Sequence, residues 1–123
     1  MTNLLKKKCV PCEKKGMKPL SRAYAQDYLD ELHGWTLNWE ANPLASAGLK
    51  ALQTGKISKE FKFKDFIGAI NFVERVADIA EMEGHHPDIH IRYNKVLLEL
   101  WTHSIGGLSE NDFIVAAKID AHN

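Results

Sequence analysis

Histidines are concentrated in one stretch of this chain. Four of the six in the sequence, His85, His86, His90 and His103, fall between positions 81 and 112. An imidazole has an unperturbed pKa of about 6.5, so it can give or take a proton near neutral pH, and its neutral form binds metal ions. The stretch therefore indicates acid–base catalysis or metal binding. The alternative is that each histidine is only a polar residue at a helix end or on an exposed strand face.

The elements expected around this stretch bring three of the histidines to one place. A long helix ends before His85, because Gly84 suits a left-handed C-cap and Pro87 cannot continue a helix. A hairpin with a tight turn at positions 94–95 then returns His103 to the level of the first histidine pair. Such a cluster can transfer protons or, with a further ligand and an activating carboxylate, hold a hydrolytic zinc ion. The spacing alone leaves both open.

Hydrophobic periodicity and turn residues predict the element order helix–strand–strand–helix–strand–strand–helix. The expected helices are 23–33, with Ser21 as N-cap and Gly34 at its end, 65–83 and 110–121; the expected strands are 35–39, 57–63, 88–93 and 96–103, with 42–55 mainly loop. Ser109 and Asp112 resemble a capping box at the start of the last helix. The order predicts an α+β two-layer sandwich, a four-stranded antiparallel sheet with three helices on one face.

Two of these helices carry apolar residues at helical spacing, which predicts the faces that they bury. In the first, the expected face is Leu20, Tyr24, Tyr28 and Leu32. In the long helix, the expected stripe is Phe66, Ile70, Val73, Ala77 and Ala80, joined by Ile67, Val76 and Ile79.

The composition is that of an ordinary soluble globular domain. The chain has 123 residues, of which 45% are hydrophobic and 26% charged. Sixteen basic residues balance sixteen acidic ones, so bulk charge gives no reason to expect a nucleic-acid or membrane partner. No apolar run approaches the roughly 18 residues of a membrane span, and the first residues lack the apolar core of a secretory signal. We therefore expect a cytoplasmic protein.

Residues 1–19 differ from the rest and are expected to form an N-terminal extension to a domain at 20–123. They contain a lysine run and both cysteines of the chain, Cys9 and Cys12, but no periodicity that supports a packed element. One interpretation is a tail with two incidental thiols. The other is half a zinc site or a redox pair, in which the nearby lysines favour the thiolate.

The histidine stretch resembles one known family, the pterin-4a-carbinolamine dehydratases. The matching residues are Glu81, the run His85-His86-Pro87, Tyr93 to Val96, Thr102-His103, and Gly107-Leu108-Ser109 with Asp112. The resemblance extends back through residues 61–66 and 75–77 to Gly34-Trp35 and covers about 90 residues. It implies loss of water from 4a-hydroxytetrahydropterin to give quinonoid dihydropterin, with no metal or cofactor.

The same resemblance implies roles for individual residues. His85 and His103 are expected to be the acid–base pair, with His86 mainly binding the pterin and Asp112 orienting His103. Glu81 is expected to line the pocket, with Pro87, Thr102 and Ser104 completing the substrate-binding set. The expected partners are a small-molecule pterin and further copies of the chain, in a homodimer or homotetramer.

Three positions depart from the family pattern and bear on the pterin contacts. Gly84 replaces a common acidic residue, Ile89 a common tryptophan and His90 a common aromatic residue. The alternative function is a non-catalytic dimerisation or interaction module of the same fold. Such a module could lose the histidines without penalty, and this chain keeps all three of the matching ones.

Overall fold

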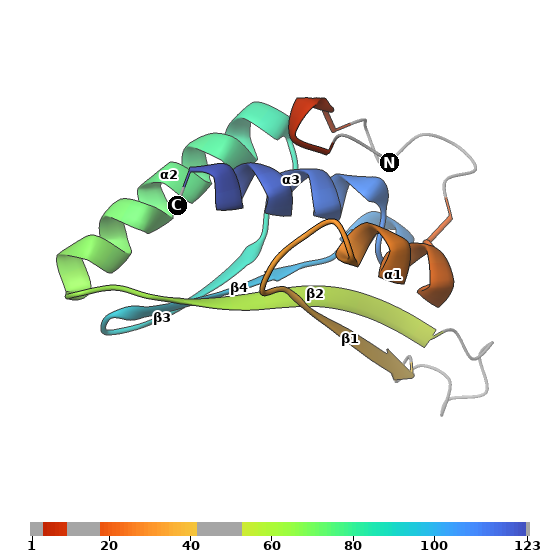
Figure 1. Ribbon diagram of the computed structural model, residues 1–123, viewed down its shortest axis with the longest axis horizontal. Helices are drawn as coiled ribbons and strands as arrows, with labels where there is room; N and C mark the ends of the chain where they lie inside the picture. The colour runs from red at the N-terminus through yellow and green to blue at the C-terminus, as the bar shows by residue number, and fades with distance from the viewer. Residues whose placement is uncertain (1–3, 10–17, 42–52, 123) are drawn as a thin grey trace.

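The structure, a computed structural model, describes residues 4–9, 18–41 and 53–122. Its elements are η1 (Leu4–Lys6), α1 (Arg22–Leu29), β1 (Thr36–Ala41), β2 (Gln53–Lys62), α2 (Phe66–Glu83), β3 (Asp88–Arg92), β4 (Lys95–Leu100), η3 (His103–Ile105) and α3 (Glu110–Ala121). The strands form one antiparallel sheet in the order β1-β2-β4-β3. All three α-helices cover the same face of this sheet (Figure 1). The predicted α+β sandwich and its element order are confirmed.

The predicted helix starts follow from local capping. The Ser21 hydroxyl accepts a hydrogen bond from the Tyr24 N–H at 3.3 Å, and the Asp65 carboxylate accepts one from the Gly68 N–H at 2.8 Å. Gly84 ends α2 with a φ of 66°, as predicted. The first helix, however, ends at Leu29 and not near residue 33. The carbonyl of His33 instead accepts a bond from the Lys59 ammonium at 2.9 Å, so β2 supplies its partner.

Strand β2 begins earlier than the sequence predicted. Residues 53–55 were expected in a loop, but they pair with β1, and Gly55 lies opposite Trp39. Glycine is usual in loops, yet here it serves a close contact, because a Cβ at position 55 would lie 2.4 Å from the Trp39 ring. The rest of the predicted loop, residues 42–52, lies outside the described residues.

The core lies between the sheet and the helices, and α2 buries only part of the predicted stripe, Val76, Ile79 and Ala80, together with Ala69 and Phe72, which were not predicted. Phe66 and Ile67 were expected inside but are 47% and 65% exposed, and Ala77 is exposed as well. Phe72 sets the phase of the helix, because its ring packs against two phenylalanines of β2 and its end, at 4.6 and 4.9 Å between centroids. The buried residues of α2 are Ala69, Phe72, Val76, Ile79 and Ala80.

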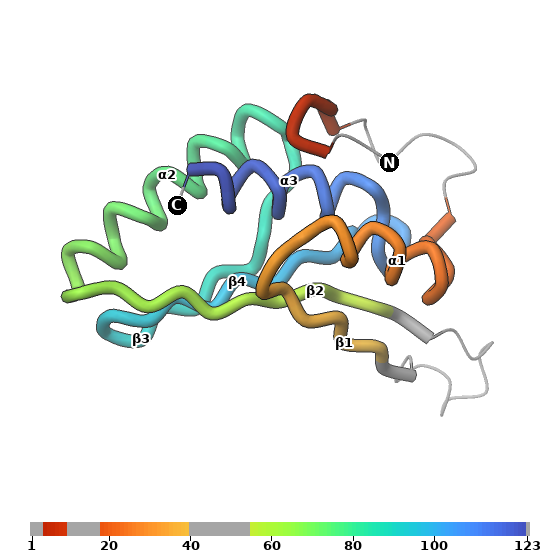
Figure 2. The backbone as a smooth tube through the Cα atoms, in the orientation of Figure 1, coloured from red at the N-terminus to blue at the C-terminus, as the bar shows by residue number. Residues whose placement is uncertain are grey.

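Three of the four residues predicted for the apolar face of the first helix, Leu20, Tyr28 and Leu32, pack against the core, but Tyr24 and the N-terminal segment depart from the prediction. Tyr24 is 65% exposed, and Ala25 is buried in its place. Leu4, in the segment expected to lack a packed element, is only 4% exposed and belongs to the core. The chain path in Figure 2 places this first turn beside α3 and the C-terminal end of α2. Lys7 fixes it there through an ion pair with Glu110 at 2.9 Å.

The β3–β4 hairpin turns at Tyr93–Asn94, one residue before the predicted position. Tyr93 has a φ of 52°, in the left-handed region. Asn94 exchanges bonds with the backbone of Phe63, donating from Nδ2 at 3.0 Å and accepting at its own carbonyl at 2.8 Å. The hairpin is thereby tied to the end of β2.

Among the helices of the described ranges, none is long and apolar enough to cross a membrane.

Candidate functional site

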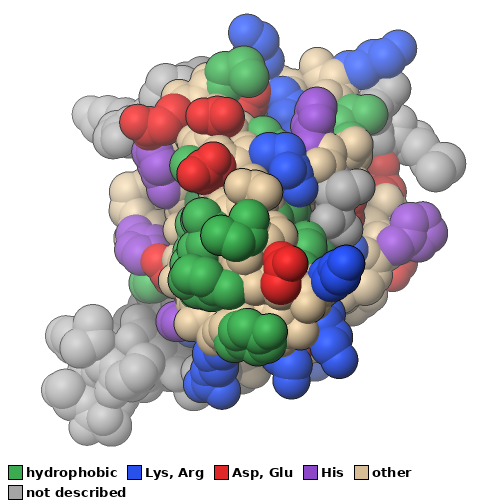
Figure 3. Space-filling view, turned by 90° about the vertical axis from the view of Figure 1, so that its left-hand side faces the viewer, with side chains coloured by type: hydrophobic (Ala, Val, Ile, Leu, Met, Phe, Trp, Pro, Cys, Tyr) green, Lys and Arg blue, Asp and Glu red, His purple; other side chains and the backbone are tan. Residues whose placement is uncertain are grey.

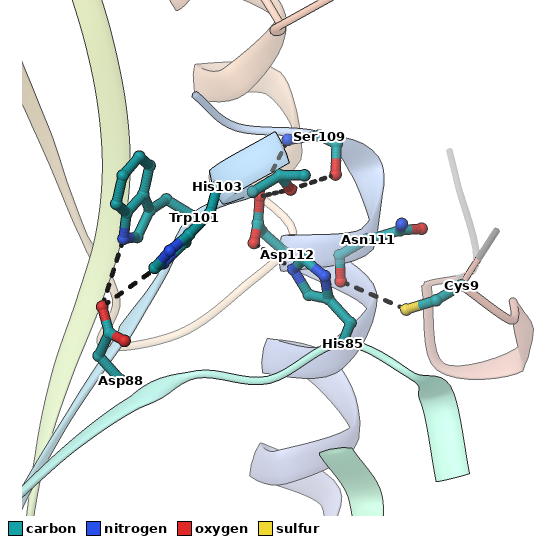
Figure 4. A network of polar contacts seen from close by, with 9 residues as sticks. Cys9, His85, Asp88, Trp101, His103, Ser109, Asn111 and Asp112 are labelled. Atoms are coloured by element: carbon teal, nitrogen blue, oxygen red, sulfur yellow. Dashed lines mark hydrogen bonds and ion pairs between the residues drawn. The ribbon is translucent and has the colours of Figure 1, made fainter. Parts of the chain in front are cut away.

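Asp112, in the first turn of α3, is the centre of a buried hydrogen-bond network. Its side chain is fully buried and accepts bonds from the Thr102 hydroxyl and the Ser109 N–H, both at 2.9 Å. The Thr102 and Ser109 hydroxyl oxygens lie 2.7 Å apart. The second carboxylate oxygen lies 2.6 Å from His85 Nε2 (Figure 4). The predicted capping box of Ser109 and Asp112 is present and also holds a histidine.

This network fixes the protonation pattern of His85. Thr102 and Ser109 donate to one oxygen of Asp112, so an ionised carboxylate can only accept from His85 at the other. Nε2 of His85 then carries the proton. Nδ1 has no hydrogen-bond partner among the described residues. His85 is therefore a nearly buried imidazole, with a side chain 10% exposed, that presents an unpaired acceptor.

His103 lies in a second, more open group with Asp88 and Trp101. Its Nε2 lies 3.8 Å from Asp88 Oδ2, and the same oxygen accepts a bond from Trp101 Nε1 at 3.3 Å. The Trp101 and His103 rings lie 3.9 Å apart between centroids at an angle of 31°. Figure 4 shows both rings directed toward Asp88. Thr102, between them in sequence, bonds to Asp112 instead and so links this group to His85.

His86 and the remaining predicted pocket residues lie on the surface near this region. His86 Nε2 is 2.6 Å from Glu81 Oε2, and the two side chains are 60% and 78% exposed. Ser104 is exposed in η3, and Pro87 is half-buried. The structure thus pairs His86 with a carboxylate, but this pair lies in solvent and not in the buried network.

His90 does not join the other three. It lies on the sheet face away from the helices, 2.8 Å from Glu99 Oε1. A concavity of about 660 Å³ opens there and is lined by His90 and residues of the hairpin, and by none of the other three histidines of the stretch. Three cations, Lys62, Lys95 and Arg92, lie directly opposite one another across β2, β4 and β3 on this face.

Behind His85, the N-terminal segment closes against the end of α2. The Glu83 carboxylate accepts bonds from Lys118 Nζ at 2.7 Å and from the Cys9 N–H at 3.0 Å. Burial favours the neutral form of Glu83, but these donors lower its pKa overall. Burial, and then the Glu83 charge, raise the pKa of Cys9 to about 12. Of the two interpretations of the cysteine pair, the lysine-stabilised thiolate is contradicted at Cys9, and Cys12 lies outside the described residues.

A metal site does not emerge from these placements. Each of the four histidines of the stretch faces a different carboxylate: Asp112, Glu81, Glu99 or Asp88. Over residues 4–9, 18–41 and 53–122, no three His, Cys, Asp or Glu side chains are arranged to hold a metal ion.

The sequence prediction and the structure differ in two respects at this site. Asp112 was expected to orient His103, but it contacts His85 with one carboxylate oxygen and Thr102 with the other. Asp88 and Trp101 were not predicted as site residues. Two signals pointed to them: Asp88 follows the His-His-Pro run, and Trp101 shares the strand face that leads to His103.

Comparisons with known proteins agree on one family. The family model described as "Pterin 4 alpha carbinolamine dehydratase" matches residues 18–122. An Arabidopsis thaliana protein, pterin-4-alpha-carbinolamine dehydratase 2, mitochondrial, is 44% identical over 121 residues, which are 98% of this chain and 59% of the relative. A putative pterin-4-alpha-carbinolamine dehydratase of Rickettsia canadensis is 41% identical over 98% of both chains. These alignments include most of the N-terminal extension, which the family model omits.

A solved structure shares the fold as well. It is described as a transcriptional coactivator/pterin dehydratase from Brucella melitensis. It superposes with a TM-score of 0.68 at 32% identity and covers 85% of this chain and 97% of its own.

Proposed function

The chain belongs to the pterin 4 alpha carbinolamine dehydratase family, and on that premise we propose that it removes water from 4a-hydroxytetrahydropterin to give quinonoid dihydropterin. The reaction breaks the C4a–O bond and takes a proton from a ring nitrogen. Hydroxide is a poor leaving group, so an acid protonates the oxygen while a base accepts the nitrogen's proton. One proton enters and one leaves, so the substrate is converted to product and water without an oxidant or reductant.

We assign the acid and base to His85 and His103. The observation that supports this is the contrast between them: His85 is buried with its Nε2 proton directed at Asp112, while the His103 side chain is 59% exposed beside Asp88. Environments that differ in this way suit two groups with different roles in one reaction. His86 and Glu81 would contact the pterin from the solvent side, with Pro87 and Ser104 along the same rim, while Thr102 would act from below through its buried bond to Asp112.

The test is the rate of dehydration of enzymatically generated 4a-hydroxytetrahydropterin in chelator-treated samples. His85→Ala and His103→Ala should each lower kcat by about 10²–10⁴, the range for a positioned acid–base group. His90→Ala is the matched control, because His90 also faces a carboxylate but lies on the other face of the sheet. Its activity should equal that of the wild type.

Other results would support other functions. A folded wild type that fails to exceed the spontaneous rate would contradict the dehydratase and favour an interaction module; the Brucella structure is described as a transcriptional coactivator as well as a pterin dehydratase. Activity that depends on added zinc would contradict metal-free acid–base catalysis. The role in pterin recycling and the cytoplasmic location remain predictions, and the Arabidopsis relative is named as mitochondrial.

We also propose that the chain self-associates. Figure 3 shows hydrophobic side chains gathered on the face that holds the start of α2 and the β3–β4 turn. The exposed large apolar residues of these elements are Phe66, Ile67, Ile91 and Tyr93, between 40% and 67% exposed. β3 is also a sheet edge with unpaired backbone groups. Sedimentation equilibrium should show a dimer or tetramer that Ile67→Glu weakens, whereas a monomeric wild type would contradict the proposal.

A further inference from the structure

We propose that Trp101 and Asp88 are positioning residues for His103, a role that rests on the proposed function of that histidine. Neither residue was assigned to the site from the sequence. Trp101 follows the last residue of β4, and Asp88 begins β3. The two are brought together because β3 and β4 pair antiparallel, with Asp88 opposite Glu99.

The geometry forms a closed group of three side chains. The indole lies against the imidazole with 3.9 Å between ring centroids. Trp101 Nε1 donates to Asp88 Oδ2 at 3.3 Å, and the same oxygen lies 3.8 Å from His103 Nε2 (Figure 4). The Trp101 indole therefore covers one face of the His103 imidazole. The Nε2 edge of the imidazole faces the Asp88 carboxylate, which the Trp101 N–H binds.

His103 needs such support because its own segment provides little. It lies in a three-residue 3-10 turn, and no side-chain bond caps that turn. Its side chain is 59% exposed, so a free imidazole there would distribute over several rotamers. Trp101 is half-buried against the core and is therefore the fixed member of the group. Its apolar ring is anchored while its N–H reaches the polar partner, a common use of tryptophan.

The comparison with His86 shows what the indole adds. His86 is equally exposed, at 60%, and has a short contact with Glu81, but Glu81 is 78% exposed and no aromatic ring of the described residues packs against the pair. An ion pair between two solvated side chains orients neither of them strongly. Of the two exposed histidines near the site, His103 is thus the one that the protein holds in a defined orientation.

The experiment measures kcat and KM for Trp101→Ala, Trp101→Phe and Asp88→Asn, together with the ring-proton resonances of His103. Trp35→Phe is the matched control, because Trp35 Nε1 also donates to an aspartate, Asp120, at 2.9 Å but away from the site. We expect Trp101→Ala to lower kcat about tenfold with little change in KM, since a small misplacement of a reacting group is costly. Trp101→Phe should recover most of this loss, because a ring still covers the imidazole.

A double-mutant cycle isolates the positioning role. If Trp101 acts through His103, adding Trp101→Ala to His103→Ala should cause no further loss of kcat. The His103 resonances should lose their upfield ring-current shift in Trp101→Ala and keep it in Trp35→Phe. An unchanged kcat in Trp101→Ala, or a rise in KM alone, would overturn the proposal. A wild type without activity would instead refute the proposed function, while the resonances would still report the stacking.

Discussion

Asp112→Asn tests the buried half of the site, because it removes a charge and keeps the shape. The carboxylate accepts bonds from His85 at 2.6 Å and from Thr102 and Ser109 at 2.9 Å. An asparagine has one oxygen, which can stay with Thr102 and Ser109, and its NH₂ group then faces His85. His85 must accept at Nε2 and carry its proton on Nδ1. The substitution therefore removes the acceptor that we assign to catalysis.

Two separate losses are expected from this change. A His85 imidazole in the wrong tautomer should lower kcat by about 10²–10⁴, the full contribution of a positioned acid–base group. For stability, each bond to a charged acceptor is worth about 1.5–3 kcal/mol and each neutral one about 0.5–1.5. Each of the three bonds becomes weaker by about 1 kcal/mol when its acceptor loses its charge, a total of roughly 3 kcal/mol. Part of this loss is offset, because an amide does not carry the desolvation penalty of a buried charge. The free energy of unfolding should therefore fall by about 1–3 kcal/mol.

The assay combines kcat, urea unfolding and the ring-nitrogen resonances of His85, which report its tautomer. Asp120→Asn is the control, because that carboxylate also accepts two bonds, from Trp35 at 2.9 Å and Lys59 at 2.8 Å, but contacts no histidine. It should lose stability and keep its kcat. The reasoning would be refuted by a folded Asp112→Asn protein whose kcat stays within about threefold of the wild type, or whose His85 retains the Nε2–H tautomer.

Three further predictions concern the scaffold. Gly55→Ala should lower the free energy of unfolding by about 1–3 kcal/mol in urea, because the added Cβ would lie 2.4 Å from the Trp39 ring. A second substitution, Trp39→Leu, should recover part of this loss, because it removes the ring that the Cβ meets. With Cys12 replaced by serine, Cys9 should react with iodoacetamide at pH 8 about 10³ times more slowly in the native than in the urea-unfolded state, since its pKa rises from 9.0 to about 12; equal rates would contradict its burial. Lys95→Glu should raise the free energy of unfolding by about 0.5–1 kcal/mol at low salt and by less at high salt. The reason is that Lys95 is repelled by Lys62 and Arg92, which lie opposite it on the two neighbouring strands, whereas a glutamate would attract both. A change in stability that does not depend on salt would argue against this electrostatic origin.

The sequence predicted those features that depend on neighbouring residues. Ser21 and Asp65 cap their helices through backbone groups three residues away, and Gly84 ends α2 through its own conformation. Strand alternation and short connections then limited the arrangement to an antiparallel sheet covered by helices. Such signals require no knowledge of distant contacts, and for that reason they could be read from the chain alone.

Features that depend on distant partners could not be predicted in this way. The apolar residues of α2 allow more than one buried face, and Phe72 selects one only through its contacts with the rings of residues 61 and 63. Leu4 is buried because η1 packs against α3, more than a hundred residues further along the chain, which no local pattern encodes. Asp112 was expected to orient His103, and its actual contact with His85 joins residues 27 positions apart, which no local pattern encodes.

Thr102 explains how two histidines that are distant in sequence can act as a pair in our proposal. Its hydroxyl donates to Asp112 and so connects to His85, while its backbone exchanges bonds with Gly107 at 2.8 and 3.3 Å. Those backbone bonds close the loop around η3, which carries His103. Thr102 therefore holds the buried Asp112 carboxylate with its side chain and the start of the exposed η3 loop with its backbone. One histidine has its proton partner inside the protein and the other is exposed to solvent, and in our proposal these two environments serve the one acid and the one base of the dehydration.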